Sequence, residues 1–302
     1  MIEIRENIAL AEYTSWLIGG PADFLCFPES IDQLLEALQW ADQRKLDVTV
    51  MGGGTNVLVS DLGIRGLVVN LRRFSGVSNL REEGGELHFT ALAGTAKSEL
   101  LKVFLKYRLA PALMLAGLPG DVGGGVVMNA GVGESIVPRE FSEIVHALRI
   151  LRKENGNWRQ VELLHNQVQW SYRHTAGWQP GIVVSVDFRW PLREEPQILE
   201  QVREANRLRL AKQPLDLPSC GSVFVNPDGH KAARLIESQG LKGFRIGDAQ
   251  VSTKHANFIV NLGKATASDT WSVIRHVQKV VFERTGVLLK TEVVRLGDWP
   301  KD

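Results

Sequence analysis

Cysteine is scarce in this sequence of 302 residues, since Cys26 and Cys220 are the only two. They form no C-x-x-C pair, and the seven histidines are scattered along the chain. Neither a disulfide framework nor a zinc site is therefore indicated, and we expect no metal in the mechanism.

Long apolar runs and an excess of one charge are also missing. No apolar run approaches the roughly 18 residues that a membrane-spanning helix needs, and the N-terminal M-I-E-I-R-E-N-I does not resemble a secretory signal. We therefore expect a cytoplasmic protein with no membrane partner. The 35 Lys and Arg residues are balanced by 34 Asp and Glu residues, so we expect no nucleic-acid partner, and any anionic ligand must be held by local groups.

Two common nucleotide-binding motifs are absent as well. Neither of the two glycine-rich stretches fits G-x-G-x-x-G, and G-x-x-x-x-G-K-[ST] does not occur. A Rossmann dinucleotide site and a P-loop are therefore unsupported.

Glycine, by contrast, is concentrated in two stretches. Residues 115–131 read L-A-G-L-P-G-D-V-G-G-G-V-V-M-N-A-G, and residues 51–56 read M-G-G-G-T-N directly after the apolar run 48–51. A bare backbone presents N–H donors that suit a phosphate or diphosphate, and a strand that runs into a glycine turn is the usual frame for a nucleotide diphosphate. Tight turns are the alternative for either stretch alone. The occurrence of both favours a nucleotide site.

The length of the chain predicts two domains or three small ones. Ser30 and Gln33 form a capping-box signature ahead of an amphipathic helix over residues 31–41. Strands are expected nearby at 48–51, 57–59 and 67–71. Residues 1–72 therefore form a small α/β unit.

Residues 73–192 are predicted to be rich in strands, with one embedded helix that Thr95 could cap. The expected strands are 87–93, 144–151, 158–161 and 182–190. Pro191 and the charged residues after it indicate a boundary, so the third segment is 193–302. Its expected elements are helices at 199–212, 230–239 and 268–284 and strands at 258–262 and 287–296.

Three polar residues outside the glycine stretches are candidates for chemistry. Arg173 lies among aromatic and hydroxyl residues, where a surface turn is the alternative. Ser222 follows a glycine, so its hydroxyl could point into a cleft, and a proton donor fits better than a nucleophile because no hydrolase elbow surrounds it. In a strand, Glu292 would share a face with Lys290 and Val294, either in solvent or in a pocket that raises its pKa.

With these residues in hand, the chain resembles the compact form of the UDP-N-acetylenolpyruvoylglucosamine reductase family over almost its whole length. Six motifs in the right order carry the resemblance: G-G-G-T-N-V-L-V (52–59), A-G-L-P-G-D-V-G-G-G-V-V-M-N-A-G (116–131), S-Y-R-H-T (171–175), K-Q-P-L-D-L-P-S-C-G-S-V-F-V-N-P (212–227), L-K-G-F-R-I-G-D-A-Q-V-S-T-K-H-A-N-F-I-V-N (241–261) and E-V (292–293).

The resemblance implies an α+β protein with the FAD-binding fold of the vanillyl-alcohol oxidase type. Two α/β subdomains, 1–72 and 73–192, would bind FAD without a covalent bond, and a C-terminal α+β domain, 193–302, would bind the substrate. NADPH would reduce the flavin and leave. Hydride would then pass to the enolpyruvyl ether of UDP-N-acetylenolpyruvoylglucosamine and give UDP-N-acetylmuramate, a precursor of cell-wall peptidoglycan.

The same resemblance assigns roles to individual residues. Ser222 would donate the proton, while Arg173 and Glu292 would steady the enolate-like intermediate. An ionised Glu292 would repel the substrate carboxylate, so we expect it to be partly protonated or paired with Arg173 or Lys290. Substrate contacts are implied for Tyr172, Asn226 and Asn257. Cofactor contacts are implied for Gly52, Gly53, Gly54, Thr55, Asn56, Val57, Gly117, Pro119, Gly120, Gly124, Asn129, Ala130, Gly131 and Ile182.

The chain departs from the family pattern at Val225, Thr175 and Cys220. Thr175 stands where serine is common and keeps the hydroxyl, and Cys220 stands where a small residue is usual. Val225 stands where lysine is common, which puts a cationic contact there in doubt, and Lys212, Arg209 or Lys254 could compensate. Two other functions stay open: an oxidase of the same flavin fold, and a nucleotide-binding module without catalysis. Ser222, Arg173 and Glu292 together argue against the oxidase, because an oxidase needs no proton donor to a substrate carbon. For the reductase we expect small-molecule partners and a monomer.

Overall fold

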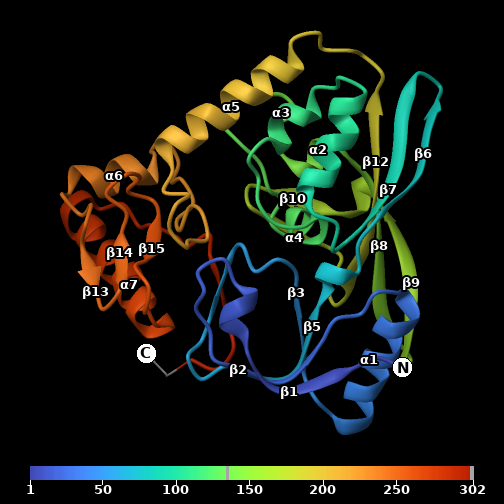
Figure 1. Ribbon diagram of the computed structural model, residues 1–302, viewed down its shortest axis with the longest axis horizontal. Helices are drawn as coiled ribbons and strands as arrows, with labels where there is room; N and C mark the ends of the chain where they lie inside the picture. Colours follow the sequence, from blue (N-terminus) through green and yellow to red (C-terminus); the bar gives the residue numbers. More distant parts are fainter. Residues whose placement is uncertain (134–135, 300–302) are drawn as a thin grey trace.

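The first lobe is a four-stranded sheet covered by one helix (Figure 1). This computed structural model describes residues 1–133 and 136–299. In sheet order the strands are β1 (Ile4–Ala9), β2 (Pro21–Cys26), β5 (Ile64–Asn70) and β3 (Val48–Met51). β5 is parallel to both its neighbours and is buried along almost its whole length, as its apolar sequence predicts.

Helix α1 (Ile31–Arg44) begins where the sequence predicted. The Ser30 hydroxyl accepts a hydrogen bond from the Gln33 N–H at 3.2 Å, while the Gln33 side chain accepts one from the Glu29 N–H at 2.8 Å. Two backbone donors at the helix start are therefore satisfied by side chains, as in a capping box shifted by one residue.

The second lobe is an antiparallel sheet of five strands with three short helices (Figure 1). In sheet order the strands are β6 (Val77–Glu83), β7 (Glu86–Leu92), β12 (Ile182–Pro191), β8 (Val145–Glu154) and β9 (Asn157–Leu164). The helices are α2 (Lys97–Lys106), α3 (Pro111–Leu115) and α4 (Val122–Val127). A small hairpin follows, made of β10 (Gln169–Ser171) and β11 (His174–Ala176).

Two sequence predictions fail in this lobe. One helix was expected but three are present, because tertiary contacts hold the glycine-rich residues of α4 in a helix despite their low helix propensity. Thr95 is not the cap of α2, whose N-cap is Ala96 without a side-chain bond. The Thr95 hydroxyl instead donates to the Gly76 carbonyl at 3.0 Å and accepts from the Gly76 N–H at 2.9 Å.

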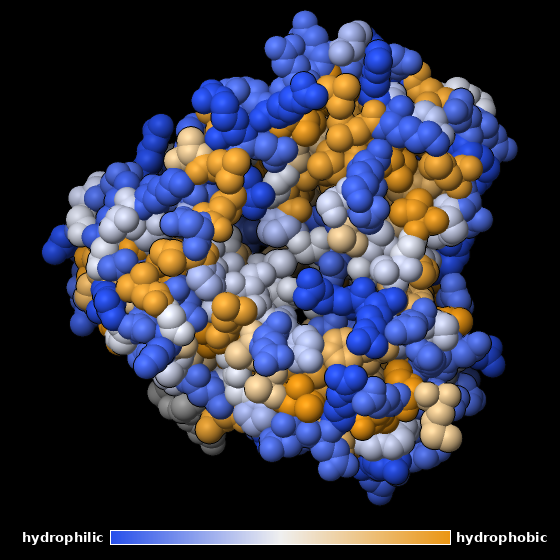
Figure 2. Space-filling model, in the orientation of Figure 1, coloured by the Kyte–Doolittle hydropathy of each residue, from blue (hydrophilic) through white to orange (hydrophobic). Residues whose placement is uncertain are grey.

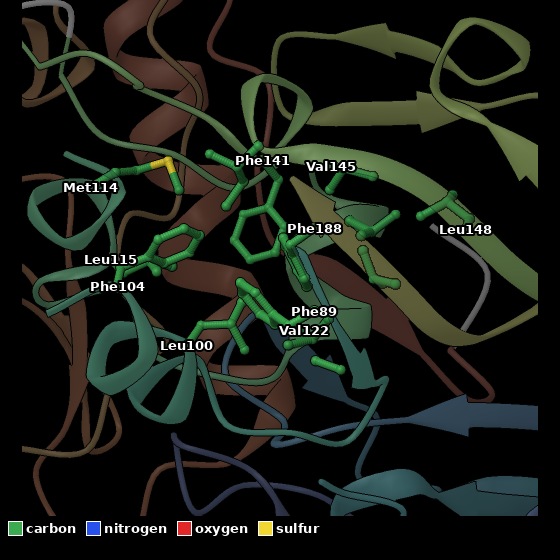
Figure 3. Close-up of a cluster of buried hydrophobic side chains, with 14 of the residues drawn as sticks. Phe89, Leu100, Phe104, Met114, Leu115, Val122, Phe141, Val145, Leu148 and Phe188 are labelled. Atoms are coloured by element: carbon green, nitrogen blue, oxygen red, sulfur yellow. The ribbon is translucent and has the colours of Figure 1, made fainter. Parts of the chain in front are cut away.

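Aromatic side chains form the centre of the second lobe's core (Figure 3). The Phe89 ring stacks on Phe188 with centroids 5.0 Å apart and meets the edge of Phe104 at 5.4 Å. Phe141 meets Phe188 at 6.3 Å and lies below α4. These buried rings fix the glycine-rich helix to the sheet.

The third lobe is reached through helix α5 (Ile198–Lys212), which runs from the second lobe toward it (Figure 1). The elements of the third lobe are α6 (Ala232–Ser238), β13 (Arg245–Ile246), β14 (Ala249–Val251), β15 (Ile259–Asn261) and α7 (Ala267–Thr285). Gly286 ends α7 in the left-handed conformation, as the sequence predicted. No helix in these described parts of the chain has the length and apolar character needed to cross a membrane.

The end of the chain returns to the first lobe. A strand was predicted over 287–296, but only β16 (Val294–Leu296) is one, and it pairs in parallel with β4 (Val57–Val59). The preceding residues form single hydrogen bonds with the Ser222 loop instead of a continuous ladder. The division of the chain into three segments stays a prediction. The pairing of β16 with β4 joins the third of these segments to the first.

A buried link joins the first and third lobes. The Trp16 indole N–H donates to the Ile259 carbonyl at 2.7 Å, and the Asn261 amide donates to the Trp16 carbonyl at 2.9 Å. The Asn261 side-chain oxygen also accepts the N–H groups of Gly263 and Ala265. One amide therefore satisfies three buried or half-buried backbone groups.

Replacing this amide should weaken the whole protein. Asn261→Ala leaves these groups unpaired, so the free energy of unfolding should fall by about 1–3 kcal/mol. Urea denaturation followed by circular dichroism measures it. Asn157→Ala, at the exposed start of β9, is the control and should change the value by less than about 0.5 kcal/mol. Equal effects of both substitutions would contradict the link.

Candidate active site

A cavity of about 1730 Å³ lies where the three lobes meet, and Figure 2 shows the surface hollowed near its centre. Both glycine stretches line it, together with the Arg173 hairpin, the Ser222 loop and Glu292. Ligand pockets typically measure about 300–1,000 Å³. The cavity is therefore large enough for a dinucleotide and a second ligand.

The first glycine stretch turns sharply after β3. Gly54 has φ +64°, and a side chain there would overlap the Tyr13 carbonyl, so only glycine fits. Asn56 donates from its side chain to the Glu292 carbonyl at 3.0 Å. This loop therefore lines the cavity and also holds the C-terminal segment in place.

The second glycine stretch serves two purposes. A Cβ on Gly125 would overlap the Phe141 ring, so this glycine is required for packing. At Gly124, on the same helix, a Cβ would meet no heavy atom within 4 Å outside its own helix, and Gly124 lines the cavity. Only part of the predicted phosphate loop therefore faces the cavity.

Arg173 lies in the turn between β10 and β11 with φ +58°. Its Nε is 3.2 Å from Oε1 of Glu292, and the two side chains are 14% and 20% exposed. Nη2 donates to the Gly131 carbonyl at 2.9 Å, and the guanidinium lies 4.8 Å from the Tyr172 ring centroid. The second glycine stretch thus orients the arginine.

Burial raises the pKa of Glu292 above its ordinary value of 4.5, while Arg173 acts in the opposite direction. The expected pairing with Arg173 is confirmed by the ion pair. Burial and the nearby Glu292 raise the pKa of Cys220 well above its ordinary value, so this thiol stays protonated. The site is a largely buried guanidinium and carboxyl beside the cavity.

The Ser222 loop is fixed by backbone pairing. Gly221 has φ +82°, and the Glu292 N–H donates to the Val223 carbonyl at 2.8 Å. The side chain of Asn257 donates to and accepts from the backbone of Phe224 at 2.8 and 3.0 Å. Ser222 is therefore held beside Glu292 at the cavity wall.

The cavity is lined by almost all of the residues that the sequence selected. Ser222, Arg173, Glu292, Tyr172, Asn226, Asn257 and Ile182 line it, as do the chosen glycine-stretch residues except Gly120 and Asn129. Gly120 lines a smaller adjoining cavity of about 280 Å³. Asn129 is fully buried and donates to the Ser171 carbonyl at 3.0 Å, so it supports the Arg173 hairpin from below.

Comparisons with known proteins agree with this geometry. A family model of the UDP-N-acetylenolpyruvoylglucosamine reductase C-terminal domain matches residues 213–296, and a model of an FAD binding domain matches residues 22–162. The UDP-N-acetylenolpyruvoylglucosamine reductase of Lactiplantibacillus plantarum is 41% identical over 298 residues, which are 98% of this chain and 95% of the relative. The chain belongs to the UDP-N-acetylenolpyruvoylglucosamine reductase family.

Two further members of this family support the assignment. The reductase of a Synechococcus species is 40% identical over 98% of this chain and 95% of its own length. The crystal structure of the reductase from Thermus caldophilus superposes with a TM-score of 0.78 at 29% identity, covering 98% of this chain and 100% of that one. The predicted family and FAD-binding fold are confirmed.

The residues of the cavity wall fit the FAD that this fold binds. The wall at Gly124 has open space in front of it, whereas Gly54 and Gly117 form tight turns with positive φ angles, packed against the Tyr13 carbonyl and the Arg209 side chain. Among the described residues, the buried Oδ2 of Asp121 also has no hydrogen-bond partner, which suits a hydroxyl of a ligand.

Sequence reasoning did not single out two charged residues of the wall. Lys97 and Asp121 both line the cavity and are 6% and 8% exposed. Lys97 gave no sequence signal, because a lysine in the first turn of a helix is usually solvated. Asp121 did give a signal, because an acidic residue inside a predicted diphosphate loop would repel the negatively charged ligand.

The two adjacent glycines provide a matched test. Gly125→Ala should lower the free energy of unfolding by about 1–3 kcal/mol, because the methyl group collides with the Phe141 ring. Gly124→Ala should leave stability unchanged or raise it by up to about 1 kcal/mol, while the methyl group projecting into the cavity weakens FAD retention. Thermal unfolding and flavin content after gel filtration measure the two effects. The same loss of stability in both variants would contradict the division of roles.

Proposed function

We propose that this protein reduces the enolpyruvyl ether of UDP-N-acetylenolpyruvoylglucosamine to UDP-N-acetylmuramate, with FAD as cofactor and NADPH as reductant. Membership of the family supports the substrate. The observation that carries the proposal is one cavity, lined by both glycine stretches, into which the Arg173–Glu292 pair and Ser222 also face.

FAD bound in this cavity would supply the hydride chemistry, from NADPH to the carbon–carbon double bond of the enol ether. The residues that would hold it are those of the first glycine stretch, together with Gly117, Gly124 and Ile182. Their bare N–H groups suit the diphosphate. In these loops no histidine or cysteine is available for a covalent link to flavin.

Arg173 is placed to stabilise negative charge. When hydride adds to the substrate, charge develops on the side of its carboxylate, and a fixed guanidinium in a largely buried site stabilises that charge more than it stabilises the ground state. Glu292 holds the Nε side of Arg173, which leaves the rest of the guanidinium to its other partners and to the substrate. Ser222, next to this pair, gives its hydroxyl proton to the adjacent carbon.

The other expected substrate residues divide into two groups. Tyr172 is half exposed beside Arg173 and is free to contact the ligand. Asn257 uses both ends of its amide on the Phe224 backbone, and Asn226 accepts the Ala232 N–H at 3.0 Å. We assign these two asparagines to positioning the Ser222 loop. Of the residues that could compensate for Val225, Arg209 lines the cavity.

The remaining parts of the proposal concern partners and compartment. Small nucleotide-linked substrates bind in the cavity. A monomeric state and a cytoplasmic location belong to the same proposal, the location because this reaction is part of precursor synthesis.

Ser222→Ala should separate the two half-reactions. In anaerobic stopped-flow experiments, NADPH should bleach the flavin at the wild-type rate, because no substrate proton is involved. Recolouring by UDP-N-acetylenolpyruvoylglucosamine should be slower by roughly 100- to 10,000-fold. Ser272→Ala, on the exposed face of α7, is the control.

Three outcomes would contradict this assignment. Normal recolouring in Ser222→Ala removes the serine from the chemistry. Recolouring of the wild type by oxygen but not by the enol ether would favour an oxidase. A colourless protein that binds the sugar nucleotide would be a binding module.

Glu292 predicts a pH dependence of substrate binding. Because its folded-state pKa is raised, this carboxyl takes up a proton at higher pH than a free glutamate, and the stability it contributes is present at low pH and lost as pH rises. Once protonated, it no longer repels an anionic substrate. The KM for the enol ether should therefore fall as pH is lowered from neutral, and Glu292→Gln should abolish this dependence. An unchanged profile in that variant would contradict it.

A further inference from the structure

Lys97 and Asp121 lie together at the junction of the two glycine stretches. Lys97 is the first residue of α2, Asp121 immediately precedes α4, and an antiparallel bridge pairs Asp121 with Ala96. Both side chains line the large cavity and are more than nine-tenths buried. Neither is among the residues proposed above to hold FAD.

The contacts of Asp121 leave one oxygen unsatisfied. Its carboxylate packs against the first stretch so closely that a Cβ on Gly52 would lie 2.8 Å from Oδ2, and the Gly53 N–H lowers its pKa. Oδ2 is buried and has no partner in the described structure. An unsatisfied buried acceptor is costly unless a ligand supplies a donor.

Lys97 supplies the opposite charge. Its Nζ donates to the Pro119 carbonyl at 2.8 Å, which uses one of three N–H donors. Burial lowers the pKa of Lys97 to about 8, and Asp121 opposes that shift. Burial raises the pKa of Asp121, and the Gly53 N–H, Arg72 and Lys97 oppose it. The attraction between the two charges therefore offsets part of the cost of burying each of them.

A hydroxyl donor and a diphosphate are both present in FAD, in its ribityl chain and its central linkage. A lone carboxylate between two diphosphate-binding loops would repel that linkage, whereas a lysine beside it removes the net charge. Oδ2 of Asp121 can then accept a hydrogen bond from a neutral hydroxyl.

We propose that Lys97 and Asp121 form a cofactor-binding pair, in which Asp121 accepts a hydrogen bond from a ribityl hydroxyl of FAD and Lys97 balances this carboxylate beside the diphosphate. The inference rests on the proposed function, because it requires FAD in this cavity.

The test uses purified holoenzyme. Serial dilution releases FAD, and the rise in flavin fluorescence gives the dissociation constant for wild type, Lys97→Met, Asp121→Ala and the double variant. Each single substitution should raise the constant about tenfold or more, because a hydrogen bond to a charged group or its balancing charge is lost. In the double variant, the factor by which the dissociation constant rises should be well below the product of the two single factors. The reason is that Lys97→Met leaves the Asp121 carboxylate to repel the diphosphate, and removing Asp121 also removes this repulsion.

Matched controls keep the same charge changes on the surface. Lys102→Met lies on the exposed face of α2, and Asp32→Asn lies on the exposed face of α1. Both should keep the wild-type constant. The visible spectrum of the bound flavin is a second readout, because a residue that only supports the fold changes thermal stability without moving the flavin bands.

The outcomes separate the two proposals. A wild-type protein that holds no flavin overturns the proposed function and this inference with it. A flavin-bound wild type with unchanged constants in the variants overturns only the inference, as does a double variant whose effect equals the product. If circular dichroism shows that Lys97→Met does not fold, the constant of Asp121→Ala decides alone.

Discussion

The ion pair between Arg173 and Glu292 is the constraint on which the arrangement of the site depends. One partner lies in the β10–β11 hairpin of the second lobe, and the other lies in the segment that carries the chain from α7 back to the first lobe. Breaking a largely buried pair on one side leaves an uncompensated charge, which is strongly unfavourable. The pair therefore holds parts of different lobes at the same end of the cavity.

Around this pair, the protein uses backbone hydrogen bonds to fix chemistry-bearing side chains. Asn129 supports the Arg173 hairpin from below, Asn56 holds the carbonyl of Glu292, and Asn257 holds the strand-like segment that follows Ser222. Precise placement of reacting groups depends on such supporting contacts more than on the reacting groups themselves. Asparagine suits this task because one side chain both donates and accepts.

The glycine stretches show how far the sequence could be interpreted. Their number and their position after an apolar run predicted a ligand site, and both stretches line one cavity, while the resemblance correctly indicated the family. The sequence could not separate Gly124, which faces the cavity, from Gly125, which packs against Phe141, because that difference depends on a ring that is distant in sequence. For the same reason, the sequence did not predict helix α4, and it predicted a strand over 287–296 where only β16 is one.

By itself, the sequence determined what depends on near neighbours along the chain. The cap at Ser30, the end of α7 at Gly286 and the apolar run of β5 follow from local backbone geometry and periodicity. Only the tertiary structure decided the burial and the ion pair of Glu292 and the burial of Lys97. The desolvation and the opposite charge that shift their pKa values come from residues on other segments of the chain, which meet only when the lobes close around the cavity.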